Sequence, residues 1–456
     1  MGFSTTFRHK ALAGVAAVAL TFTPLATAAE TLGDALASAY RNSGLLEQNR
    51  ANLRATDEGV AAALADLRPT LSYQAQSSAA EIQGEWTSQL TFNAGMTLYT
   101  FGRNKLALDA AKETVLATRQ TLVNIEQTVL DGAIAAYMDM REQQALVNLR
   151  DSAVRLSQQN LRAARDRFEV GEITRTQVSQ FEAQLASARA QLAAAQGQLS
   201  AAREAYKVAV GHYPSNLSTP PAVRLPASSV EQAVTIAKQS HPGIKALQHR
   251  VAALDLAVAI NERSQLPSVE AGARMTFADD GSRSDNFSIT ASGPIYSGGK
   301  IASNIRKAIA QRDAARAELL QTTREIEQNV RANWSMLSVL SASEQASRAL
   351  VEAQRVAYEG VREEAELGAS TTLDVLDAEQ ALLDAQVGAI QAQIARETQG
   401  FAVLRTMGRL TVAGLNLNVP TYDPTAYYNA VKDGPGRYVS PEGEKLNRVL
   451  EALGRK

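Results

Sequence analysis

The sequence predicts a mostly α-helical fold that also contains membrane-crossing β-strands. Three observations indicate this class. Ala, Leu, Gln, Arg and Glu dominate long stretches and only 5% of the residues are aromatic, which favours long helices. A unit of about 200 residues occurs twice in tandem. Each copy contains two runs of alternating apolar and polar residues, and about ten such residues can cross a bilayer as a tilted strand.

The composition excludes several classes of function. The 456-residue chain has a net charge of -1, so no overall basic field attracts nucleic acid. It contains no cysteine, which excludes disulfides, thiolate metal sites and lipid attachment to cysteine. Only four histidines occur, which leaves little for zinc binding or general-base chemistry. We therefore expect no catalytic residue, no metal site and no cofactor.

Residues 1–28 have the pattern of a cleaved signal peptide. A basic segment, an apolar run and the small residues that a signal peptidase requires follow one another at 8–10, 11–20 and 26–28. An uncleaved membrane anchor is the alternative, but the apolar run is short for a membrane span. We expect the mature, exported chain to begin at Ala29.

Three pairs of short segments reveal the duplication, at offsets of about 197 residues. The pairs are 67–69 with 265–267, 98–102 with 295–298, and 170–174 with 367–371. We therefore divide the chain into a first repeat at 29–213, a Pro- and Ser-rich linker at 214–229, a second repeat at 230–410, and a C-terminal tail at 411–456 that is partly disordered.

In both repeats a helical stretch precedes two strand-like runs. The helical stretches cover 45–67 and 244–266, and each stops before a proline, because proline cannot continue a helix. Strands are predicted at about 70–80, 86–99, 268–278 and 286–296, with turns at 83–85 and 278–286.

The predicted strands have one largely apolar face and one polar face. In a soluble sandwich the apolar face would meet a second sheet or a helix. In a membrane barrel it would meet lipid, and the polar face would line a wet lumen. Four strands cannot close a barrel, and open edges in lipid would leave backbone groups unpaired, so several chains would have to share the sheet. The export signal and the flanking helices favour the barrel.

A helical hairpin far longer than a globular domain requires follows each strand pair. No proline interrupts 103–170 or 300–367, and each stretch would be roughly 100 Å long as a helix. The hairpins are predicted at about 103–210 and 300–407. A fibrous coiled coil would explain these helices but leave the strand pairs unexplained.

The hairpin tips have clear turn chemistry. Gly171 and Gly368 suit the left-handed position that ends a helix. Thr174, with Gln177 three residues later, forms a capping box, and Thr371 is the corresponding N-cap in the second hairpin.

These segments resemble the TolC family of outer-membrane efflux and type I secretion channels. The resemblance runs from Thr31 to about Leu410 and is most specific at 170–178 and 367–378. It implies a homotrimer in which four strands per chain make one twelve-stranded barrel, surrounded by outer-membrane lipid in a Gram-negative bacterium. Twelve helical rods would extend this barrel into the periplasm as a tunnel.

The resemblance implies a passive exit duct for a tripartite efflux or type I secretion system. An inner-membrane ABC or RND-type transporter would supply the energy, and a periplasmic adaptor would couple it to the duct. The alternative is a soluble periplasmic adaptor or a structural coiled-coil protein. Adaptors usually carry one hairpin flanked by small β domains, so the duplicated strand pairs argue against that alternative.

In this family the hairpin tips lie at the periplasmic entrance, where adaptors dock. The resemblance therefore makes Val170, Gly171, Leu367 and Gly368 docking residues. The alternative is that the tips are two ordinary helix ends, where glycine would be required in any case.

Asp374 and Asp377 match family positions whose carboxylates ring the narrowest part of the pore. The corresponding residues of the first repeat are Gln177 and Gln180, so only the second hairpin carries the acids. Three chains would form two rings of carboxylates, a pattern that favours cations. The alternative is that Asp374 favours a helix N-terminus and that Asp377 is solvated.

The family's closed gate is not conserved here, since Ala365, Ser370 and Gln177 occupy its positions. Opposite charges near the two tips suggest a substitute that would hold neighbouring hairpins together, or else an ordinary solvated surface. The residues are Arg162, Arg165 and Arg167 on one side and Glu363, Glu364 and Glu366 on the other.

Three aromatic residues are predicted at strand ends, where aromatic rings anchor a barrel at the membrane interfaces. They are Trp86, Tyr99 and Tyr296. Ordinary strand packing is the alternative.

Overall fold

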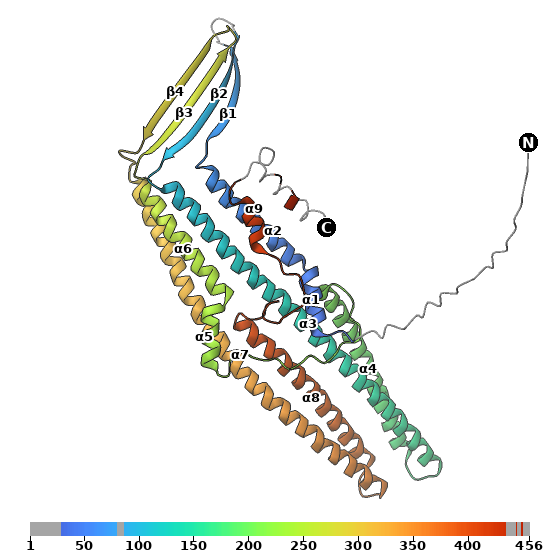
Figure 1. Ribbon diagram of the computed structural model, residues 1–456. Helices are drawn as coiled ribbons and strands as arrows, with labels where there is room; N and C mark the ends of the chain where they lie inside the picture. The colour runs from blue at the N-terminus through green and yellow to red at the C-terminus, as the bar shows by residue number, and fades with distance from the viewer. Residues whose placement is uncertain (1–28, 80–85, 435–443, 445–447, 450–456) are drawn as a thin grey trace, which may run out of the picture.

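The computed structural model describes residues 29–79, 86–434, 444 and 448–449. The chain is elongated, with a four-stranded sheet at one end and two helical hairpins that point away from it (Figure 1). The predicted signal peptide and the predicted turn at 83–85 lie outside the described residues.

The helices alternate with the strands twice along the chain. They are α1 (Leu32–Asn42), α2 (Gly44–Ala65), α3 (Arg103–Glu169), α4 (Arg175–Val210), α5 (Val230–Ser240), α6 (Pro242–Arg263), α7 (Lys300–Glu366), α8 (Thr372–Thr406) and α9 (Pro424–Val431). The strands are β1 (Thr70–Ala79), β2 (Trp86–Tyr99), β3 (Ser268–Ala278) and β4 (Arg283–Ser292).

The sheet has the order β1-β2-β3-β4, and every neighbouring pair is antiparallel. Its register places apolar side chains opposite one another across three strands, as in the row Tyr73, Phe92 and Met275. Alternate residues point to opposite faces of a sheet, so this register collects the apolar side chains on one face and the polar ones on the other. The two repeats meet where β2 pairs with β3.

The prediction for the fourth strand was wrong at both ends, because β4 spans Arg283–Ser292 rather than 286–296. A tight turn at Gly281, with φ of +78°, lets the strand begin early and pairs Arg283 with Phe277. At the other end Gly293 packs so closely on Pro267 that an added Cβ would lie 2.9 Å from it. Pro294 then follows, and proline lacks the N–H that a strand ladder requires.

The predicted helical stretches before the strands correspond to α2 and α6. Each ends a few residues ahead of its proline, Pro69 or Pro267, since the residue before proline avoids the helical conformation. Three shorter helices were not predicted. The 11-residue helices α1 and α5 precede α2 and α6, and α9 lies in the tail, where Val431 is buried.

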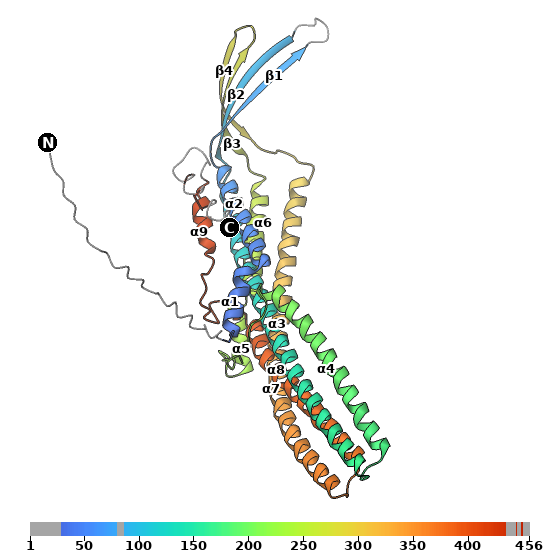
Figure 2. The same cartoon turned by 90° about the vertical axis from the view of Figure 1, so that its right-hand side faces the viewer.

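Helices α3 and α7 each contain 67 residues and run from the sheet to the tips. Near the sheet, α2 packs on α3 and α6 on α7, and α3 also packs on α6. Near the tips, α4 packs on α3 and α8 packs on α7, and α3 also packs on α8 (Figure 2). Among the residues that the structure describes, no helix combines the length and the apolar character needed to cross a membrane.

Both tips have the predicted turn. Gly171 and Gly368 have φ angles of +79° and +78°, and an added Cβ would contact nothing within 4 Å at either position. Backbone conformation alone therefore favours glycine there. The hydroxyl of Thr174 accepts a hydrogen bond from the N–H of Gln177, and the hydroxyl of Thr371 accepts one from the N–H of Asp374. Each bond is part of a complete capping box.

The largest apolar core lies at the waist, where α1, α3 and α4 meet the ends of the linker. Glu30 fastens the start of the described chain to this core. Its carboxylate accepts hydrogen bonds from Tyr206 Oη at 2.6 Å and from Ser215 Oγ at 3.0 Å, and lies 3.0 Å from His212 Nε2. Burial would raise the pKa of Glu30, but the hydrogen bonds from Tyr206 and Ser215, with a contribution from His212, hold the pKa below its usual value.

We expect Glu30→Gln to lower the free energy of unfolding by about 1–3 kcal/mol at pH 7, because the buried donors lose a charged acceptor. A lowered carboxyl pKa stabilises the fold above the ordinary value of 4.5, and this contribution disappears as the pH falls through the folded pKa. Thermal unfolding from pH 7 to pH 3 should therefore show the variant and the wild type converging in acid. Glu204→Gln, at an exposed position on α4, is the control. An acid-independent difference would contradict this explanation.

We expect Thr371→Ala to destabilise the first turn of α8 by about 1 kcal/mol, because the N-cap oxygen is lost. Amide hydrogen exchange in that turn should accelerate by roughly fivefold. Thr174→Ala should have the same effect on α4, whereas Thr176→Ala, an exposed position beside that cap, should leave exchange unchanged. Equal exchange in the Thr371 variant and the wild type would show that the cap does not hold the tip.

Candidate functional site

The two hairpin tips form the end of the molecule farthest from the sheet (Figure 1). Val170 and Leu367, the last residues before the glycine turns, expose 72% and 86% of their surface. Gly171 and Gly368 follow directly, and the open space around them leaves both turns accessible. Two large apolar side chains thus protrude from the hairpin tips, and the helix that follows each tip begins with a capping box.

A groove of about 650 Å³ separates the tips. Its walls come from both hairpins and combine apolar, polar and charged groups, including Arg167, Gln177, Tyr358, Arg362 and Leu367. The sequence placed each tip correctly but gave no sign of this groove, because its walls are residues far apart in the chain.

The two aspartates of the second hairpin are exposed on α8. The carboxylate of Asp374 accepts hydrogen bonds from the Thr371 N–H at 2.8 Å and from Thr371 Oγ1 at 2.6 Å. These bonds lower the pKa of Asp374 below its usual value. Asp374 therefore takes part in the N-terminal capping of α8 within one chain, which is the alternative to a pore role, and its side chain remains exposed to solvent. Asp377 lies one turn further along, also exposed.

The residues at the family's gate positions, Gln177, Ser370 and Ala365, make other contacts in this chain. Gln177 donates a hydrogen bond from Nε2 to Thr372 Oγ1 at 3.0 Å, which joins the first hairpin to the second. Ser370 donates to Glu364 at 2.7 Å, within the second hairpin. Ala365 lines the groove without a polar group.

The predicted opposite charges do not pair across the hairpins within one chain. Arg165 contacts Glu182 at 2.7 Å and Arg167 contacts Glu172 at 3.1 Å, both within the first hairpin. Arg162 donates to the backbone of its own helix, and Glu366 lies 4.0 Å from Arg362. Local partners are closer because neighbouring turns of one hairpin present them at the same height. Pairing between chains stays a prediction, which a raised resting conductance after charge reversal at Arg165 and Arg167 would support.

The aromatic residues lie at different places around the sheet. Trp86 begins β2 and Tyr99 ends it, and Tyr99 packs on Phe101 with ring centroids 4.8 Å apart. Tyr296 is not at a strand end, because β4 stops at Ser292, but it is exposed in the loop that leads to α7. A role for the three residues at a membrane interface stays a prediction.

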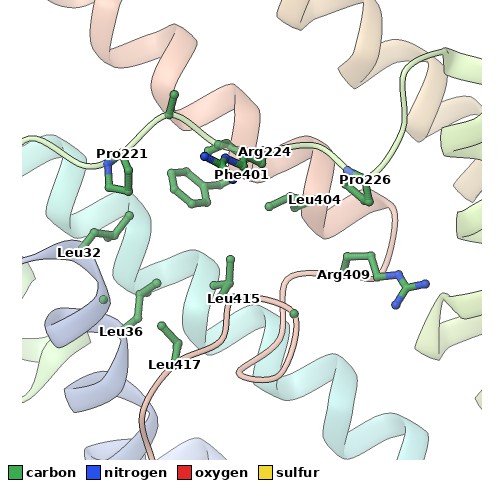
Figure 3. A pocket seen from close by; sticks show the side chains of 14 residues that line it. Leu32, Leu36, Pro221, Arg224, Pro226, Phe401, Leu404, Arg409, Leu415 and Leu417 are labelled. Carbon is green, nitrogen blue, oxygen red and sulfur yellow. The ribbon is translucent and has the colours of Figure 1, made fainter.

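A second, more apolar cavity of about 520 Å³ lies at the waist (Figure 3). Leu32 and Leu36 of α1, Phe401 and Leu404 of α8 and the proline-rich linker surround it. Leu32, Leu36, Phe401 and Leu404 are also members of the apolar core at the waist, so the cavity adjoins that core. Among the described residues, no group of three or more His, Cys, Asp or Glu side chains could hold a metal ion.

Comparison with known proteins agrees with this architecture. The family described as Outer membrane efflux protein matches residues 35–212 and 233–409, once in each repeat. Outer membrane efflux protein BepC of Brucella suis biovar 1 is 34% identical over 443 residues, covering 94% of this chain and 97% of BepC.

Two solved channels have a similar fold. VceC from Vibrio cholerae has a TM-score of 0.72 and 21% identity, over 83% of this chain and 96% of VceC. The open state of MtrE from Neisseria gonorrhoeae has a TM-score of 0.72 and 19% identity, over 83% of this chain and 88% of MtrE. With a family match in each repeat and a close relative over nearly its whole length, the chain belongs to the outer membrane efflux protein family, the TolC-like channels of the Gram-negative outer membrane.

Proposed function

We propose that three copies of this chain form the passive exit duct of a tripartite efflux or type I secretion system. The observation that supports this most directly is the sheet, which has one apolar and one polar face and, among the described residues, no strand beyond β1 or β4 at its edges. Three such sheets joined at their edges would make a closed barrel of twelve strands, with the apolar face toward lipid. The helical hairpins would continue this barrel through the periplasm.

The apolar face of the sheet is strongly exposed in one chain. Leu71, Phe287 and Ile289 expose 78%, 82% and 76% of their surface. Exposed apolar surface on this scale indicates a nonaqueous environment or a partner, because water would oppose it. In the part of the chain that the structure describes, no further strand pairs with the outer edges of β1 and β4. Lipid on the face and a second chain at each edge would satisfy both requirements.

The helical part supports the same assembly. Several large apolar side chains of α7 are exposed along its length: Leu320, Met336, Val339, Leu350 and Val356. Large apolar side chains that are exposed along a helix of one chain fit packing against the next chain of a trimer.

The tips are proposed as the docking site for the periplasmic adaptor, which would connect the duct to an inner-membrane ABC or RND-type transporter. The protruding Val170 and Leu367 and the groove between the hairpins offer apolar anchors surrounded by polar groups, the composition that favours protein interfaces. The duct itself would catalyse no reaction, and the transporter would supply the energy.

The native mass after outer-membrane fractionation and mild detergent extraction tests the assembly. We expect a particle of three chains in the outer-membrane fraction that conducts ions in planar bilayers. A detergent-independent monomer in the periplasmic fraction would reject the barrel and support a soluble adaptor.

We expect the double variant Asp374→Ala, Asp377→Ala to reduce the preference of the channel for cations and its block by multivalent cations, because three chains lose two rings of carboxylates. Reversal potentials across a salt gradient measure the preference. Asp313→Ala, an exposed position on α7 far from the tips, is the control. Unchanged selectivity in the double variant would leave Asp374 with a capping role alone.

A further inference from the structure

A line of polar contacts joins the two hairpins where α3 packs on α8. Asn160 donates to Glu379 at 2.9 Å, Arg141 pairs with Glu397 at 2.7 Å, and Arg405 pairs with Asp131 at 2.5 Å. Residue numbers fall along α3 as they rise along α8, so the two antiparallel helices keep one register from the tips to the waist. The hairpins of one chain are thus held together by specific pairs as well as by apolar packing.

The contact nearest the tips differs from the other two. Glu379 exposes only 6% of its surface, and Ser157 of α3 and Tyr358 of α7 are also buried at this height. The Glu379 carboxylate accepts its hydrogen bond from the neutral amide of Asn160, and it forms no ion pair within the described residues. Burying an acid without a cation is unfavourable, and such a group marks a place where a specific contact is required.

The electrostatics of Glu379 are consistent with a hydrogen bond rather than an ion pair. Burial raises the pKa of this carboxyl, and hydrogen bonding to the Asn160 amide and the nearby Ser157 hydroxyl offsets part of the rise. A side chain that supplies the same acceptor without charge should therefore preserve the contact. Glutamine has nearly the same shape and offers a carbonyl oxygen at the same position.

The Asn160–Glu379 contact lies close to the hairpin tips. Glu379 lies eight residues after the Thr371 N-cap, about 12 Å along α8. Between it and the tips, the hairpins also meet through the Gln177–Thr372 hydrogen bond and through the Tyr358 hydroxyl beside Asn160. The Gln177–Thr372 bond is only partly buried, so water competes for its donor. Loss of the buried contact would therefore free the last turns of both hairpins to separate.

We propose that Glu379 and Asn160 form a latch that holds the α7–α8 hairpin against α3 and keeps the periplasmic entrance narrow at rest. The latch takes the role left open by Ala365, Ser370 and Gln177 at the family's gate positions. It rests on the proposed channel function, since it regulates the entrance of that channel. Adaptor docking at the tips would then open the duct by separating these two residues.

Resting conductance of purified trimers in planar bilayers tests the latch. Glu379→Ala and Asn160→Ala should each raise it by at least about fivefold, the effect of losing a buried hydrogen bond. The double variant should open the channel little further, because both substitutions break one contact. Glu379→Gln should stay within about twofold of the wild type. Asp384→Asn, which removes an exposed charge on the same helix, is the matched control.

Each result decides between the latch and a general structural role. Intact trimers of Glu379→Ala and Asn160→Ala with wild-type conductance would overturn the latch, as would Glu379→Gln opening as widely as Glu379→Ala. If Glu379→Ala forms no trimer, Asn160→Ala carries the test, since it keeps the acid and removes its donor. A wild-type chain that forms no conducting trimer would instead overturn the proposed function, before any variant is compared.

Discussion

The packing of helix α3 is the constraint on which the rest of the molecule depends. This single helix contacts α1 and α2, its hairpin partner α4, and both α6 and α8 of the second repeat. It has buried residues along its whole length, including Val115 near the sheet, Tyr137 at the waist and Leu161 near the tip. Because a continuous helix has a fixed rise per residue, every element that packs on α3 is placed at a defined height between the sheet and the tips.

Duplication explains why the two repeats share one backbone and differ on the surface. The glycine turns and capping boxes are nearly identical at the two tips, since the same local geometry is required in both. Surface chemistry is free of that requirement. Gln177 of the first hairpin makes a contact to the second, whereas Asp374, its counterpart, is exposed toward solvent. The two similar repeats can thus carry an exposed acid in one copy and a neutral contact between the hairpins in the other.

Polar groups within the helical body divide into two kinds. Glu30 is surrounded by donors and has a lowered pKa, so it stabilises the waist as an ionised group. Glu379 is buried among neutral groups, the Asn160 amide and the Ser157 hydroxyl, and burial raises its pKa, so its environment tolerates charge poorly. The first arrangement suits a permanent anchor. The second suits a contact that can be exchanged for water when the hairpins separate, because solvation of the carboxyl offsets part of the lost bond.

Some features could be read from the chain because they depend on neighbours in sequence. The 67-residue helices need an absence of proline, the tips need glycine at positive φ followed by a threonine cap, and β2 and β3 need alternating side chains. The family resemblance then identified the channel fold. The shorter helices α1, α5 and α9 were not predicted, because they are too short to show a long periodic pattern. Tertiary packing stabilises them instead.

The sequence alone thus determined the duplication, the long hairpins, the capped tips and the two-faced strands, since each follows from local chemistry or a repeated motif. Only the tertiary structure decided which side chains border the groove between the tips, that Arg141 pairs with Glu397, and that Asn160 meets Glu379. The physical reason is distance along the chain. Contacts between residues more than 200 positions apart depend on how two repeats pack, and many surface residues could occupy such a position without changing the pattern that a sequence displays.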